Sequence, residues 1–168
     1  FRALSTGTVP LVSRAWGARD YARAEKAAGQ SISLSLLVAG AVVALTWPLA
    51  EEYFILMGAE PKVVQEGTVY LRWVLTTSWL GLPIVAFTGS MRAAGDTRTP
   101  MWITGIMNAW NVIAAYALIF GVGPVPALGL AGAGMATASA RFLGGLLCLG
   151  ALLTGRSGIK VPWRAVLA

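Results

Sequence analysis

The chain has 168 residues, of which 57% are hydrophobic and only 12% carry a charged side chain, whereas a soluble domain carries roughly a quarter charged residues. Together with a mean hydropathy of +0.69, this composition excludes an ordinary soluble domain and indicates an integral membrane protein. The net charge of +6 does not indicate a nucleic-acid-binding protein, because the basic residues lie in short clusters between apolar runs. A single cysteine, Cys148, and no histidine exclude an internal disulfide and a cysteine-based metal site.

Residues 1–13 are too few to cross a bilayer, which takes about 20 helical residues, and we interpret them as the cytoplasmic half of a helix. The chain opens on Phe1 without a signal-peptide pattern, which indicates a fragment. Residues 14–30 form a predicted basic connection, in which Asp20 caps a short amphipathic helix.

Four apolar segments are each long enough to span a membrane as a helix. Their predicted ranges are 31–50, 68–91, 100–121 and 128–153. The second contains Gly81-Leu82-Pro83, which predicts a kink, and the fourth begins with small residues over 129–140, which let a neighbouring helix approach closely. The sequence therefore predicts an all-α polytopic membrane protein of four full helices and a half helix.

A charged turn separates the second and third full helices. Its residues are Arg92, Gly95, Asp96, Arg98 and Pro100. Gly95-Asp96 supplies turn chemistry, Thr99 is the expected cap, and Pro100 suits a first helical position. The inner segments 14–30, 92–99 and 154–168 hold nine Lys and Arg residues against one in the outer loops. The positive-inside tendency therefore predicts that these segments and both chain ends are cytoplasmic.

Three polar residues share one face of the 100–121 helix. Thr104, Asn108 and Asn111 recur at i, i+4 and i+7, a helical spacing. Because an unpaired amide in hydrocarbon costs several kcal/mol, this face should meet protein or a wet cavity. Two readings stay open at this stage: hydrogen bonds between helices, or a cavity lining that holds a cation or substrate.

Two arginines lie outside the expected loops. Arg2 precedes Arg14 by twelve residues, about 18 Å along a helix, and Arg141 lies thirteen residues into its segment. A central arginine costs at least about 2.5 kcal/mol on insertion scales, so each should find carbonyl or carboxylate partners inside the protein. We favour a structural partner for Arg141, and Thr137, one turn earlier, as the cavity-lining residue.

Several motifs occur in the order and spacing of one family of transporters. They are Gly7-Thr8, the segment 14–20, Tyr70-Leu71-Arg72, the segment 92–100, Asn108 with Asn111, and the segment 129–137. With these, the sequence resembles the N-terminal half of the multidrug and toxic compound extrusion (MATE) transporters. The resemblance implies a twelve-helix antiporter of two six-helix lobes, in which this chain is part of the first lobe and a first helix and a second lobe are missing.

The resemblance further implies export of bulky, often cationic organic compounds across the plasma (inner) membrane in exchange for Na⁺ or H⁺. It places Asn111 near the cation site. An acid that some members carry about four residues later is Ala115 here, and the family's best-known acid lies on the missing first helix. We therefore expect that the coupling of export to Na⁺ or H⁺ uses the missing first helix, or that this protein binds the ion or substrate through a different set of residues.

Two other functions remain as alternatives: a flippase of lipids or lipid-linked precursors, which Arg2 and Arg141 favour, and a non-transporting membrane scaffold. We expect no enzyme, no catalytic residue, no metal site and no cofactor beyond the coupling ion, because the sequence has no catalytic pair or phosphate-binding glycine loop. The expected partners are the small organic substrate, the lipid bilayer and the rest of the protein, with no nucleic acid.

Overall fold

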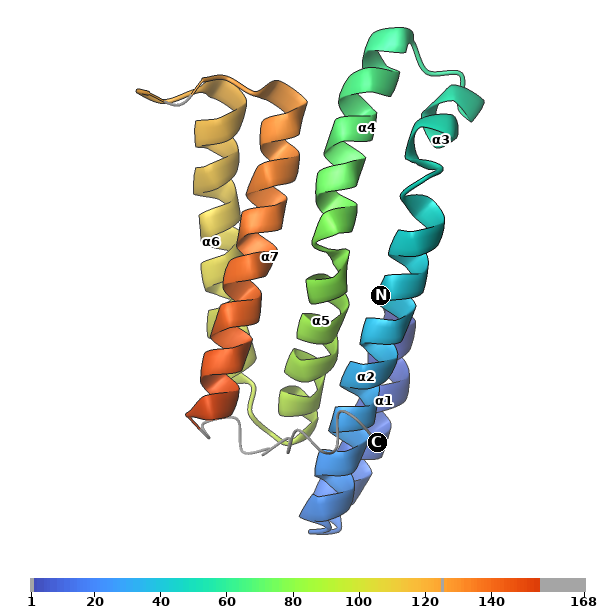
Figure 1. Ribbon diagram of the computed structural model, residues 1–168. Helices are drawn as coiled ribbons and strands as arrows, with labels where there is room; N and C mark the ends of the chain where they lie inside the picture. The colour runs from blue at the N-terminus through green and yellow to red at the C-terminus, as the bar shows by residue number, and fades with distance from the viewer. Residues whose placement is uncertain (1, 125, 155–168) are drawn as a thin grey trace.

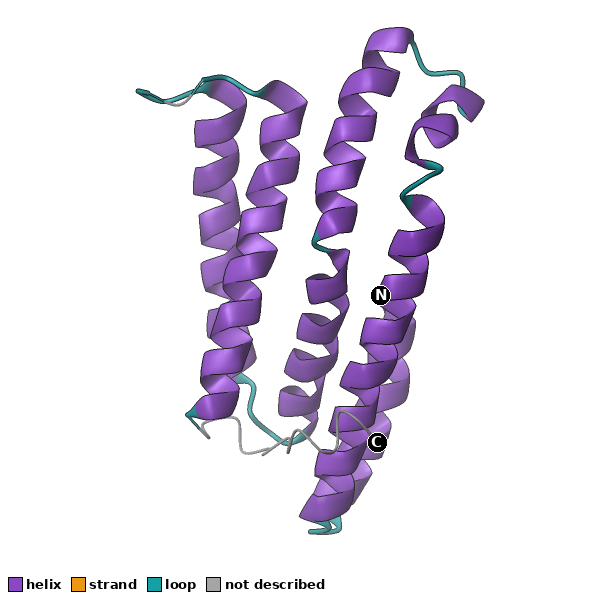
Figure 2. Ribbon diagram, viewed as in Figure 1, coloured by secondary structure: helices purple, strands orange, loops and turns teal. Residues whose placement is uncertain are grey.

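The computed structural model describes residues 2–124 and 126–154, with side chains from residue 7 onward. Within these residues the chain is all-helical (Figures 1 and 2). The helices are α1 (Arg2–Gly17), α2 (Tyr21–Thr46), α3 (Ala50–Leu56), α4 (Pro61–Thr76), α5 (Ser78–Ala93), α6 (Arg98–Phe120) and α7 (Gly129–Leu153).

Three of the described helices, α2, α6 and α7, are long and apolar enough to cross a membrane. The pair α4 and α5 forms a fourth candidate span, which bends by 47° at the break between them. Spans of this length and apolarity define an integral membrane protein. The shorter α1 runs along only the lower part of α2 (Figure 1).

The loops gather at the two ends of the bundle (Figure 1). The turns at 18–20 and 94–97 and the end of α7 lie at one end. At the other end lie α3 and the loop residues 121–124 and 126–128. This arrangement puts two of the predicted basic segments on the same side. Residues 155–168 of the predicted tail lie outside the described residues.

The predicted connection over 14–30 differs most from the structure. It is helical except for a turn at 18–20, and α2 begins at Tyr21, ten residues before the expected span. Asp20 caps a helix as predicted, with its carboxylate accepting from the Arg23 N–H at 3.1 Å. The helix continues because the alanine-rich stretch after it contains no breaker. Arg19 closes α1 with φ 60°.

The second predicted span, 68–91, begins earlier and breaks earlier than expected. α4 starts at Pro61, and the break falls at Thr77 and not at Gly81–Pro83. The hydroxyls of Thr76 and Ser78 donate to the carbonyls of Arg72 and Val74 at 2.7 and 2.8 Å. Such bonds compete with the helical ladder and bend helices. The outer loop also contains a helix, α3, that was not predicted.

The turn between α5 and α6 is built from Gly95 and Asp96. Gly95 has φ +91°, and the Asp96 N–H donates back to the Met91 carbonyl at 3.0 Å, as in a Schellman ending. The Asp96 carboxylate accepts from the Thr99 N–H at 3.0 Å. The expectations that Thr99 caps α6 and that Pro100 is its first residue were therefore wrong: a carboxylate matches the helix N-terminus better, and Pro100 is the third helical residue.

The small-residue segment at the start of α7 packs between α6 and α4. A Cβ at Gly132 would meet the Leu118 backbone of α6, and a Cβ at Gly134 would lie 2.9 Å from the Trp73 Cβ of α4. The prediction that this segment lies against other helices of the lobe is confirmed. A second group of contacts joins α5 to α1 and α2. These three helices pack around a core that includes Val12, Phe87 and Met91.

Candidate functional site

The polar face of α6 is open in the described part of the chain. Thr104 and Asn108 are exposed and Asn111 is half-buried. Along α6, contacts with α7 are made by Met107, which meets Gly144, and by Leu118, which meets Gly132. Asn111 follows Met107 by four residues and so lies on the same row of the helix, at the edge of the α7 interface, whereas Thr104 and Asn108 are exposed.

Among the described residues, no hydrogen bond reaches the side chain of Thr104, Asn108 or Asn111. The hypothesis that these side chains form hydrogen bonds between helices therefore finds no partner residue within this part of the lobe. Because a bare amide facing lipid tails is costly, the partner of this face is either water in a cavity or a part of the protein beyond these helices.

Thr137 lies on α7 and is half-buried. Its hydroxyl donates to the Ala133 carbonyl of its own helix at 3.0 Å, and no hydrogen bond joins it to the asparagines within the described residues. The polar link between α6 and α7 is a different one: the Trp110 indole N–H donates to the Ser139 hydroxyl at 3.1 Å. Trp110 therefore links α6 to α7, although 46% of the residue is exposed.

Arg141 occupies the break between α4 and α5. Its Nη1 donates to the Val74 carbonyl at 2.8 Å and contacts the Ser78 hydroxyl at 3.5 Å. Gly81 leaves room beside it, since a Cβ there would lie 3.6 Å from the Arg141 Nε. The guanidinium thus rests on the C-terminal end of α4, where carbonyls are not fully paired and the helix dipole favours a positive charge.

An arginine in the middle of a membrane-spanning helix requires a polar partner inside the protein. The Val74 carbonyl is that partner for Arg141. The arginine is engaged with the fold and does not form an open anionic-ligand site by itself, so it lends no weight to the flippase alternative. Arg2 is the first residue of α1, and its side chain lies outside the described residues.

The sequence analysis did not identify Val74 and Ser78 as the partners of Arg141. The signal that marks them is the run Thr76-Thr77-Ser78, three hydroxyl residues within an apolar span, which favours a local break. The turn residues Arg92 and Arg98 are exposed and lie at the end of the bundle away from α3 (Figure 1).

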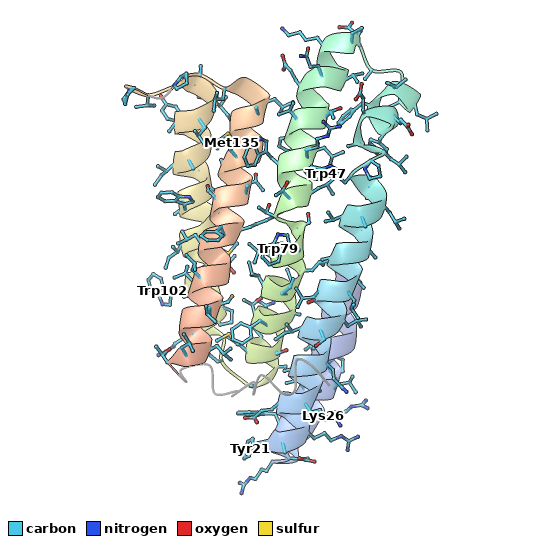
Figure 3. All side chains as sticks on the ribbon, viewed as in Figure 1. Tyr21, Lys26, Trp47, Trp79, Trp102 and Met135 are labelled. Atoms are coloured by element: carbon cyan, nitrogen blue, oxygen red, sulfur yellow. The ribbon has the colours of Figure 1, made fainter. Side chains whose placement is uncertain are left out.

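An apolar cleft of about 450 Å³ opens between α2, α5 and α7. Trp79, Phe87 and Phe142 are among its lining residues, and Figure 3 shows the position of Trp79 on α5. The wall of the cleft is almost entirely apolar, and it contains no charged or amide side chain that would orient a polar ligand. We therefore place the candidate site on the polar face of α6 and not in this cleft.

A bundle of apolar spans with a polar face and an internal arginine defines a polytopic membrane protein. The family model MatE matches residues 1–117, and the chain belongs to this family. Its relatives are transporters and not enzymes.

The chain is similar to a protein from Thermotoga maritima named "Probable multidrug resistance protein NorM", with 35% identity over 84% of this chain and 31% of the relative. It is also similar to "Uncharacterized transporter YisQ" from Bacillus subtilis, with 28% identity over 99% of this chain and 36% of the relative. The chain thus spans about a third of the length of these relatives.

Among solved structures, the fold resembles that reported as the inward-facing conformation of a multidrug resistance MATE family transporter of the MOP superfamily. The TM-score is 0.87 at 24% identity, and the match covers 96% of this chain and 36% of that one. The expected fold class, part of a lobe of a MATE-like transporter, is confirmed.

Proposed function

We propose that the chain is part of a secondary active antiporter of the plasma membrane, which exports organic, often cationic, compounds in exchange for Na⁺ or H⁺. The observation that carries this proposal is the open polar face of α6, where Thr104, Asn108 and Asn111 lie on a membrane-spanning helix without hydrogen-bond partners among the described residues. Similarity to proteins named for multidrug resistance supports the substrate class.

The chemistry of this face suits a weakly held cation. An asparagine amide offers a neutral carbonyl oxygen, a hard ligand of the kind that sodium takes, and an N–H₂ group that can bind a protonated carboxyl. Asn111 is our choice for the central role, because it is half-buried and so is partly shielded from competing water. Asn108 and Thr104, which are exposed, would line the approach, with Thr137 behind them on α7.

In this proposal the turns at 18–20 and 94–97 face the cytoplasm. Both are flanked by exposed arginines, Arg19 and Arg92 among them, and both lie at the end of the bundle opposite the acidic segment around α3 (Figure 1). This charge asymmetry is the basis of the orientation.

The proposal is tested by transport in proteoliposomes that contain the full-length protein. Drug movement is measured after a sodium or a pH gradient is imposed, for the wild type and for Asn111→Leu, Asn108→Leu and a control, Ile113→Leu, which alters an exposed apolar side chain on the same helix. We expect one gradient to drive transport, Asn111→Leu to lose most of it, Asn108→Leu to lose less, and the control to keep it.

Full coupled transport by Asn111→Leu at normal expression, or a larger loss in Asn108→Leu, would contradict the assignment of Asn111. Transport that responds to neither gradient would contradict antiport itself. Each result is read against the amount of folded protein in the vesicles, so that a folding defect is not mistaken for a loss of coupling.

A further inference from the structure

A second pocket lies at the α3 end of the bundle, away from the polar face of α6. It has a volume of about 560 Å³ and is formed between α3 and α4. Its polar lining residues are Glu51, Gln65, Thr68 and Arg72, and Ile55 and Val64 are among its apolar ones. The pocket therefore combines one negative charge, one positive charge and two neutral hydrogen-bonding groups with a hydrocarbon wall.

Thr68 indicates that this pocket is not simply a gap between helices. The residue is only 5% exposed, and its hydroxyl is buried without a hydrogen-bond partner among the described residues. An unpaired buried hydroxyl is unfavourable. Thr68 is one of the residues that line the pocket, and a ligand that displaces the groups covering the hydroxyl would supply the missing partner.

The two charges are also unpaired with each other. No ion pair joins Glu51 to Arg72 in the part of the chain that the structure describes, although both line the same pocket. Both residues are exposed, so their charges are available to a molecule with two charged ends. The planar guanidinium suits a phosphate or carboxylate, and the Glu51 carboxylate suits an ammonium group.

The location of the pocket narrows the class of ligand. Arg72 lies eleven residues into α4, about 16 Å along the helix. Trp47 caps the end of α2 that leads to α3 and is 40% exposed (Figure 3). Tryptophan is enriched where a membrane meets water. Polar groups at the rim with apolar walls below them match an amphiphile that stands in the membrane interface.

We propose that the α3–α4 pocket binds a zwitterionic phosphoethanolamine group, with the phosphate at Arg72, the ammonium at Glu51 and a further hydrogen bond from the Thr68 hydroxyl. A membrane phospholipid supplies this group together with acyl chains that lie along the apolar walls. The pocket is a site separate from the face of α6, so its occupation does not depend on the proposed transport function.

The test uses the full-length transporter in detergent with a photoactivatable phosphatidylethanolamine. We expect label on peptides that contain residues 51–72, and affinity lowered about tenfold or more in Arg72→Gln and Glu51→Gln, because each variant loses a charge-assisted contact. Glu52→Gln is the matched control: Glu52 is an exposed neighbour that is not among the pocket residues, and we expect it to bind as the wild type does.

Competition separates the possible sources of the headgroup. Unlabelled phosphatidylethanolamine should displace the label, and phosphatidylglycerol, which lacks the ammonium group, should not. Displacement by soluble phosphoethanolamine at a similar concentration would support the same chemistry and assign the ligand to solution. Equal displacement by both phospholipids, or label that is confined to other peptides, would overturn the proposal.

Thr68→Val distinguishes binding from a merely structural role. Removing an unpaired buried hydroxyl should leave the thermal stability of the lipid-free protein unchanged or raised, while the affinity for phosphatidylethanolamine should fall several-fold. A variant that loses stability but binds the lipid normally would contradict the proposal.

Discussion

At Gly132, α7 packs directly against the backbone of α6. A Cβ at this position would lie 2.6 Å from the carbonyl carbon of Leu118 and 3.0 Å from the Leu118 Cβ. The obstacle is backbone, and it is held in place because the Leu118 carbonyl accepts a hydrogen bond from the Leu128 N–H at 2.9 Å. Gly132→Ala therefore forces the two helices apart.

The magnitude follows from two opposing effects. Overpacking costs about 1–3 kcal/mol, and a backbone obstacle that cannot rotate away places this case near the upper value. Alanine recovers about 1 kcal/mol of helix propensity, so we expect a net loss of about 2 kcal/mol. Gly150 is the matched control on the same helix, because a Cβ there meets nothing within 4 Å among the described residues.

The assay is thermal unfolding of the full-length protein in detergent. The relatives are about three times as long as this chain, so the shift for the full-length protein is at most about 2 °C per kcal/mol. Gly132→Ala should therefore melt up to about 4 °C lower than the wild type. Gly150→Ala should melt at the same temperature or higher. If the two variants melted alike, or if Gly132→Ala were as stable as the wild type, the close packing of α6 on α7 would be refuted.

Three further changes test single contacts by the same assay. Arg141→Met removes the cation from the end of α4 and should cost about 1–2 kcal/mol, with Arg141→Lys recovering part; no loss would contradict the contact with Val74. Arg19→Gly relieves a side chain held at φ 60° and should raise stability by about 1 kcal/mol; a lower melting temperature would show that the turn is not strained. Partial burial raises the pKa of Asp96, but hydrogen bonds from Thr99 and the Arg98 N–H outweigh this and hold its pKa below the ordinary value. Its carboxylate should therefore stabilise the protein above about pH 3.9 and lose that effect as the pH falls through the lower folded pKa. Asp96→Asn should remove this part of the pH dependence, and an unchanged acid response in the variant would contradict the role.

Features that depend on local pattern could be predicted from the sequence. The apolar spans followed from hydropathy, and the packing of the small residues over 129–140 followed from their size. The cap by Asp20 was also predictable, because an aspartate just before an alanine-rich stretch commonly caps the helix by accepting a hydrogen bond from a backbone N–H of its first turn.

Features that depend on distant contacts could not be predicted. The partner of Arg141 is a backbone carbonyl 67 positions away, which no side-chain pattern records. A short helix after Asp20 was predicted, but its continuation into the membrane span as α2 was missed, because its charged first turns were assigned to a separate connection although no residue there breaks a helix. Thr68 carried no sequence signal at all, since its importance rests on burial beside α3.

The most direct test of the account is whether water reaches the polar face of α6 in the membrane. Asn108→Cys and Ile113→Cys are made in a cysteine-free background of the full-length transporter, in which Cys148 is replaced by serine, and are treated with a membrane-impermeant thiol reagent. Both positions are exposed among the described residues, but only Asn108 lies on the polar face. The account predicts rapid labelling at 108 that substrate slows, and little labelling at 113. Equal labelling at the two positions, or no labelling at 108 in folded protein, would contradict it.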